Sequence, residues 1–219
     1  MKSCPISWLE SRIFAETTLK KSLIRNFALL FLWWIVFFPG FYSGDSFQAL
    51  DMAQTGNLTN SGTASWAVFV RAFSLWGNAF PILSLLCGLL LIYATTQLAF
   101  SLFTDSTASP SSFILSVTPL VSGMGITLWH DIPFTAGLLL VVSFIIKRLR
   151  FENRKLKADL CALLIPGAIL ITFKPNGIAT LIVFALLLLL QKKSRSLCMH
   201  LLLAVSIATG ITLSLSYEV

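Results

Sequence analysis

Charge is what this sequence has least of. Only 11% of its 219 residues are Asp, Glu, Lys or Arg, whereas 56% are hydrophobic and the mean hydropathy is +0.84. A soluble globular domain typically has about a quarter of its residues charged. The shortage excludes an ordinary soluble domain and indicates that lipid is the solvent for most of the chain. We therefore attribute the net charge of +7 to basic loops, and expect no nucleic-acid partner.

The sequence also lacks the usual signatures of soluble enzymes and metal sites. It has no Gly-rich phosphate loop, no H-E-x-x-H and no G-x-S-x-G. Its four cysteines form no C-x-x-C pair, so we predict neither a zinc site nor a disulfide framework. Asp45 and Asp51 could share a divalent cation through oxygen ligands, but two carboxylates alone require none. The sequence identifies no cofactor.

Long apolar runs are what the chain has in place of charge. Each is near the length that a helix needs to cross a bilayer core. We predict an all-α, polytopic membrane protein with about seven transmembrane helices, in which a basic N-terminal segment (1–26) precedes a membrane domain (27–219). The predicted spans are 27–38, 80–103, 113–128, 134–146, 160–173, 178–190 and 197–215.

The basic residues give the orientation of these spans. Of the sixteen Lys and Arg residues, fourteen lie in 1–26, 147–157 and 192–195, and only Arg71 and Lys174 fall on the other side. Cytoplasmic loops of membrane proteins carry an excess of Lys and Arg. The N-terminus is therefore predicted to be cytoplasmic, in a multi-pass membrane protein.

The external loop 43–78 is predicted to carry interfacial helices. A serine or aspartate near the start of an apolar pattern, as at Asp45, is typical of a helix N-terminus. After a polar loop, aromatic and aliphatic residues from Trp66 to Trp76 surround Arg71. This spacing predicts a second helix in the interface, with Arg71 extended towards lipid phosphates.

On this topology, three polar clusters meet at the external face. Asp45 follows the first span, His130 and Asp131 lie between two later spans, and Lys174 and Asn176 form a further turn. Ionisable residues at the ends of apolar helices are commonly functional. Together they would supply a general base and groups that stabilise an anion. Each also has a simpler interpretation, as a helix cap, an interfacial pair or a lysine that contacts lipid phosphates.

Three short motifs carry a family resemblance. They are 38–48 (FPGFYSGDSFQ), 128–134 (LWHDIPF) and 173–177 (FKPNG). Together they resemble the N-terminal module of GT-C superfamily membrane glycosyltransferases, in the branch of the protein-mannosyltransferases and aminoarabinose transferases. The resemblance extends over about residues 27 to 190.

The resemblance implies an enzyme that transfers a sugar, with inversion, from a polyprenyl-phosphate-linked donor to an acceptor hydroxyl on the external face. Asp45 matches the family's acidic residue after the first span and would act as the catalytic base. Asp131 matches a second acidic position, and Lys174 stands where arginine is more usual. Membrane lipid and the polyprenyl-phosphate donor are the expected partners, and a bacterial inner membrane is the expected location, because the motifs resemble those of bacterial members. The substrate-binding residues expected are His130, Lys174, Asn176, Arg71 and Gln48.

The sequence also departs from the family. Related proteins often carry a His-Pro pair where the external loop re-enters the membrane, whereas this chain has ASWA at 64–67. The family also continues for several more helices. Two other classes therefore stay open: a transporter or flippase for a lipid-linked or anionic substrate, although no internal repeat is evident, and a non-catalytic membrane subunit.

Overall fold

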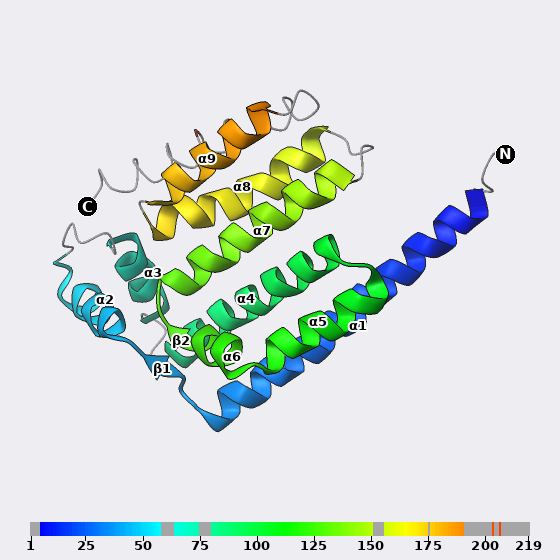
Figure 1. Ribbon diagram of the computed structural model, residues 1–219. Helices are drawn as coiled ribbons and strands as arrows, with labels where there is room; N and C mark the ends of the chain where they lie inside the picture. The colour runs from blue at the N-terminus through cyan, green and yellow to red at the C-terminus, as the bar shows by residue number, and fades with distance from the viewer. Residues whose placement is uncertain are drawn as a thin grey trace.

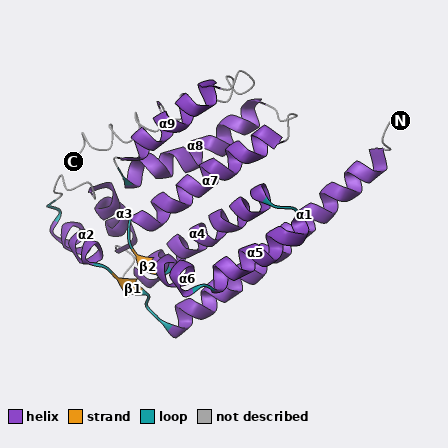
Figure 2. Ribbon diagram, in the orientation of Figure 1, coloured by secondary structure: helices purple, strands orange, loops and turns teal. Residues whose placement is uncertain are grey.

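The computed structural model describes residues 5–57, 64–74, 80–150, 156–174 and 176–190, together with residues 203 and 206. Within these ranges the fold is all-α, apart from two strands of two residues each (Figures 1 and 2). Most of the predicted span 197–215 and the basic loop 192–195 lie outside the described residues. The elements are α1 (Pro5–Val36), β1 (Phe41–Tyr42), α2 (Gly44–Thr55), α3 (Ala64–Ser74), α4 (Phe80–Leu102), α5 (Asp105–Val117), α6 (Pro119–Gly125), β2 (Thr127–Leu128), α7 (Asp131–Arg150), α8 (Leu156–Phe173) and α9 (Asn176–Leu190).

The helices pack in a row, with the short helices α2 and α3 at one end (Figure 1). α1 lies along α5, both contact α4, and α7, α8 and α9 follow in order (Figure 1). α2 packs on α3, which contacts α4 and α8. One apolar core joins α7, α8 and α9, and a larger one joins α4 and α7 to α2, α3 and β2.

Two of the described helices are long and apolar enough to cross a membrane. They are Pro81–Leu102 in α4 and Asp131–Arg150 in α7. Shorter apolar helices cover Leu163–Phe173 and Asn176–Leu186. Two such helices alone are weak support for a membrane protein, because a buried core helix of a soluble protein passes the same test of length and composition.

Helix α1 begins much earlier than the first predicted span. It starts at Pro5 and includes most of the basic segment 1–26 in one helix of 32 residues. Polar contacts join α1 to its neighbours: the Ser22 hydroxyl donates to Ser109 of α5, and the Asn26 amide donates to Thr96, which is buried in α4. Hydrogen bonds of this kind between polar side chains stabilise the packing of one helix on another. The helix ends just before Pro39, as expected.

The predicted turn at 104–112 and span at 113–128 are wrong in their boundaries. The chain is already helical at Asp105 and breaks at Thr118, so α5 and α6 are separate pieces. Tertiary contacts outweigh the weak helix propensity of this Ser- and Thr-rich stretch, since Ser109 accepts hydrogen bonds from α1. Pro119 begins α6, where its missing N–H costs nothing. Together the two helices return the chain to the end that holds β1 and β2 (Figure 1).

The two short strands join the segment that leads into α2 to the segment that leads into α7. β1 pairs in parallel with β2, Phe41 opposite Thr127 and Tyr42 opposite Leu128. Gly40 permits the approach, because it has φ of +110° and a Cβ there would lie 2.5 Å from the Ile126 carbonyl oxygen. The pairing places the start of α2 beside the start of α7.

Candidate functional site

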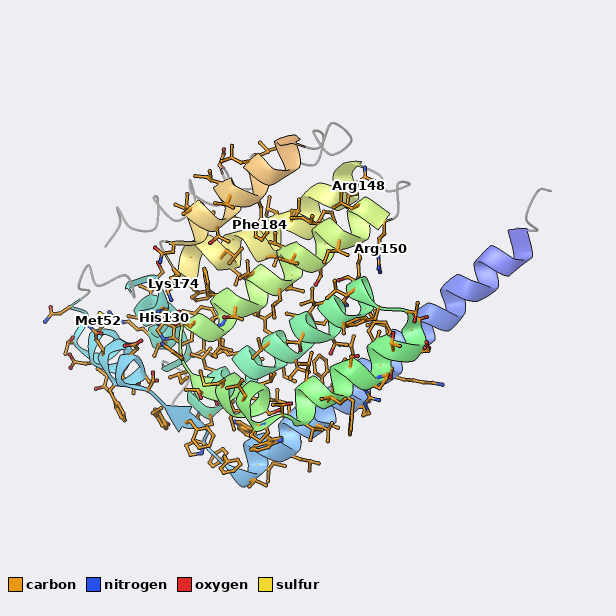
Figure 3. All side chains as sticks on the ribbon, viewed as in Figure 1. Met52, His130, Arg148, Arg150, Lys174 and Phe184 are labelled. Carbon is orange, nitrogen blue, oxygen red and sulfur yellow. The ribbon has the colours of Figure 1, made fainter. Side chains whose placement is uncertain are left out.

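A polar cluster occupies the end of the molecule where α7 begins and α8 ends. Lys174 Nζ donates to Asp131 Oδ1 at 2.6 Å, and His130 Nε2 lies 3.3 Å from the same oxygen. The Asp131 and Lys174 side chains are 23% and 32% exposed, so the pair is partly shielded from water. Figure 3 shows His130 and Lys174 side by side at this end, with Arg148 and Arg150 at the other.

Asp45 joins this cluster through Trp129. The Trp129 indole N–H donates to Asp45 Oδ2 at 2.8 Å, across 84 residues of sequence. Asp45 lies in the first turn of α2. The carboxylate also acts electrostatically on His130: it favours the charged imidazole, but burial of the ring outweighs this effect and lowers the pKa. Sequence reasoning predicted that Asp45, His130, Asp131 and Lys174 would share one face, and in the structure they share one site.

The start of α2 is built differently from the sequence prediction. Ser43 is the N-cap, and it forms a reciprocal capping box with Ser46, while Asp45 sits inside the first turn. The Ser46 hydroxyl also donates to the Leu128 carbonyl of β2. Asp45 therefore stands on a helix end that is tied to the α7 side, where its negative charge is also stabilised by the helix dipole.

Lys174 is positioned by aromatic packing and a tight turn. Phe173 contacts the rings of Trp66 and Phe69 of α3 at centroid distances of 5.6 and 5.5 Å. Gly177 permits α9 to begin close to α8, because a Cβ there would lie 2.1 Å from the Leu170 carbonyl oxygen. The predicted interfacial helix is thus a packing element of the site, and Trp66 is fully buried.

His130 is held as a neutral imidazole. Desolvation lowers its pKa below the ordinary 6.5 and is the largest effect, with Lys174 acting in the same direction and Asp131 and Asp45 opposing it. The residue is 8% exposed, and its buried Nδ1 has no hydrogen-bond partner within the described residues. A neutral imidazole has one N–H donor and one acceptor nitrogen, and it adds no charge to the cluster while it stays neutral.

The other three predicted substrate-binding residues lie on α2, α3 and α9. Asn176 is exposed at the first position of α9, and Gln48 is exposed on α2, one turn beyond Asp45. Arg71 lies beside Gly56, its Nη1 being 3.4 Å from the position of a Cβ on that glycine. Gly56 is the C-cap of α2, about 17 Å along the helix from Asp45. There the guanidinium complements the negative end of the helix dipole.

The described residues contain no group of three His, Cys, Asp or Glu side chains able to hold a metal ion. Asp51 lies six residues beyond Asp45 on α2, about 240° around the helix, and is exposed. The two carboxylates therefore do not share a helix face. This geometry gives no support to a cation held between them.

Trp129 is the residue that sequence reasoning missed. The residue was interpreted only as an interfacial neighbour of His130, although it lies within the 128–134 motif. Nothing local in the sequence shows that its indole reaches Asp45, because the contact depends on the pairing of β1 with β2. The signal that was present is an aromatic donor directly before two ionisable residues.

No protein-family model, curated protein or solved structure matches this chain. The site must therefore be interpreted from its own geometry.

Proposed function

We propose that this protein is a membrane glycosyltransferase of the GT-C type. It transfers a sugar from a polyprenyl-phosphate-linked donor to an acceptor hydroxyl on the external face. The proposal includes about seven membrane spans, a cytoplasmic N-terminus and location in a bacterial inner membrane.

The surface of the described helices supports the membrane part of the proposal. Large apolar side chains are exposed along the outer helices, including Ile35 and Val36 of α1, Ile114 of α5 and Leu186 of α9. Monomeric soluble proteins rarely expose apolar surface on this scale. The polar contacts of α1 with α4 and α5 are instead internal, as expected when lipid surrounds the bundle.

The distribution of charge along the bundle supports the proposed orientation. Lys147, Arg148 and Arg150 close α7 at the end opposite the polar cluster (Figure 3). Arg150 donates to the carbonyl oxygens of Ser101 and Leu102 at the end of α4. The site end carries Asp45 and Asp131. This difference between the two ends agrees with a basic cytoplasmic face.

The chemistry of the cluster suits sugar transfer from a lipid phosphate. Asp45 would accept the proton of the acceptor hydroxyl as that oxygen bonds to the anomeric carbon and the bond to the phosphate oxygen breaks. Lys174 has three N–H donors, of which Asp131 takes one, so the others can stabilise the departing phosphate. Asp131 would orient Lys174 and, with it, His130. Arg71 is not part of this reaction centre.

One observation carries the proposal. Strand pairing and the Trp129 bond bring a carboxylate from the external loop to a carboxylate, an imidazole and an ammonium at the ends of two apolar helices. A lipid-linked phosphate must be bound where lipid meets water, and the acceptor must reach it from outside. The end of a helix bundle meets both requirements.

The test is replacement of Asp45 by Asn, with Asp51→Asn on the same helix as the matched control. The protein would be reconstituted in liposomes with undecaprenyl-phosphate hexoses, and release of undecaprenyl phosphate measured. Loss of a general base should lower the rate by about 100- to 10,000-fold. Asp51→Asn should stay within about twofold, since surface substitutions seldom disturb the fold.

Full activity in Asp45→Asn would remove Asp45 from the catalytic role. Movement of the lipid-linked sugar across the bilayer by the wild-type protein, without release of undecaprenyl phosphate, would instead identify a flippase.

A further inference from the structure

The hydrogen bond between Trp129 and Asp45 joins the two halves of the site. Asp45 comes from the external loop after α1, and Trp129 from the short link between β2 and α7. Within the described residues, the Trp129 indole is the one side chain that donates to the Asp45 carboxylate, and it reaches only Oδ2. One carboxylate oxygen is thus held while the other is left for substrate.

The backbone at Trp129 is held on both sides of the residue. Leu128, directly before Trp129, is paired with Tyr42 of β1 and accepts the Ser46 hydroxyl. On the other side, the Trp129 carbonyl oxygen accepts the Ile132 amide at 3.1 Å in the first turn of α7. The Trp129 and His130 rings lie edge to face, with centroids 6.4 Å apart.

An indole has properties that a lysine or histidine in the same place would lack. Its N–H is a donor only, and it does not titrate at physiological pH. It orients a carboxylate by a charge-assisted hydrogen bond without competing for the proton that the carboxylate must accept. It also adds no positive charge that would neutralise the base.

From this geometry we infer that Trp129 is a positioning residue for Asp45. It fixes the carboxylate so that Oδ1 faces the acceptor hydroxyl, and it couples the external loop to the cluster of His130, Asp131 and Lys174. The catalytic part of this inference rests on the proposed function, whereas the positioning of the carboxylate can be measured without any substrate.

The first experiment tests the bond itself. The chain has six tryptophans, so a ¹⁵N-indole spectrum in detergent micelles gives six N–H cross-peaks at most. The Trp129 peak is identified by its loss in Trp129→Phe. The inference predicts that Asp45→Asn shifts this peak more than any other. An unmoved Trp129 peak would show that the bond is absent and would overturn the inference.

The second experiment tests the role in the reaction, with undecaprenyl-phosphate hexoses as the probe. Trp129→Phe keeps the ring but loses the donor, and it should lower kcat on the order of 10- to 100-fold while KM changes less than about twofold. Trp129→His, which restores a ring N–H, should recover part of the loss.

Trp34→Phe is the matched control for this experiment. In the wild-type protein the Trp34 indole also donates a hydrogen bond, to the Pro81 carbonyl oxygen at 3.1 Å, away from the carboxylates. The Trp34→Phe variant should retain the wild-type kcat.

The two experiments separate the inference from the proposed function. A wild-type kcat in Trp129→Phe would overturn the catalytic role of Trp129 and leave the proposed function intact. If the wild-type protein transfers no sugar but its Trp129 peak responds to Asp45→Asn, the positioning of Asp45 is supported and the proposed reaction is refuted.

Discussion

Asp131 is the central residue of the cluster, because one of its oxygens contacts both Lys174 and His130. A partly shielded ion pair of this kind contributes modestly to stability, on the order of 1 kcal/mol. Its larger effect is on the charge of the site. Asp131 balances Lys174, so with His130 neutral the remaining charge is that of Asp45. The base proposed for the reaction is therefore the unbalanced charge of the cluster.

The depressed pKa of His130 predicts a pH dependence of stability. Below its ordinary pKa of 6.5 the unfolded chain takes up a proton that the folded protein resists, because desolvation disfavours the charged imidazole. The stability that this group contributes is therefore complete above pH 6.5 and declines as pH falls below it. Thermal unfolding midpoints in detergent from pH 7.5 to 5.5 would measure the decline. His130→Asn should show a shallower decline, and an identical pH profile would contradict the assignment.

At the scale of elements, the β1–β2 pairing decides whether the site forms. Gly40→Ala would force a Cβ against the Ile126 carbonyl oxygen and strain a positive φ, so we expect destabilisation by about 1–3 kcal/mol and loss of sugar transfer. Gly44→Ala is the matched control, since a Cβ at Gly44 meets nothing within 4 Å. Thermal unfolding and transfer assays would measure both variants. Equal effects in the two would show that the strand pairing is unimportant.

The sequence allowed the apolar helices of this fold to be predicted closely. The predicted span at 80–103 corresponds to α4 (Phe80–Leu102), and that at 160–173 to the C-terminal part of α8. The helical start of α5 at Asp105 was not predicted, because hydrogen bonds from α1 to Ser109 stabilise a segment whose local composition indicates a loop. The start of α1 at Pro5 was not predicted either. A hydrophobic pattern indicates which segments are buried in lipid or in a core, but it does not indicate polar contacts between helices.

The sequence allowed the residues of the cluster to be predicted, but not the hydrogen bonds and ion pair between them. The shared side of Asp45, Asp131 and Lys174 followed from counting spans. The Asp131–Lys174 pair and the Trp129–Asp45 bond could not be inferred, because each joins residues more than forty positions apart through packing that no local pattern encodes.

At the scale of the whole molecule, the bundle has two chemically different ends. The first turn of α7 and the end of α8 hold the acidic, histidine and lysine side chains, and the end of α7 and the middle of α1 hold arginines and lysines. An enzyme that uses a lipid-linked donor needs such a difference, because donor and acceptor meet at one membrane face only. On the proposed function, the membrane separates these two ends.

The most direct test is labelling of single cysteines by a membrane-impermeant thiol reagent in vesicles of known orientation. Exposed positions would be used in a cysteine-free background: Gln48→Cys and Asn176→Cys at the site end, Lys21→Cys and Leu149→Cys at the basic end. We expect Gln48→Cys and Asn176→Cys to react only from the external side, and Lys21→Cys and Leu149→Cys only from the cytoplasmic side. Reaction of all four from the same side would contradict this orientation.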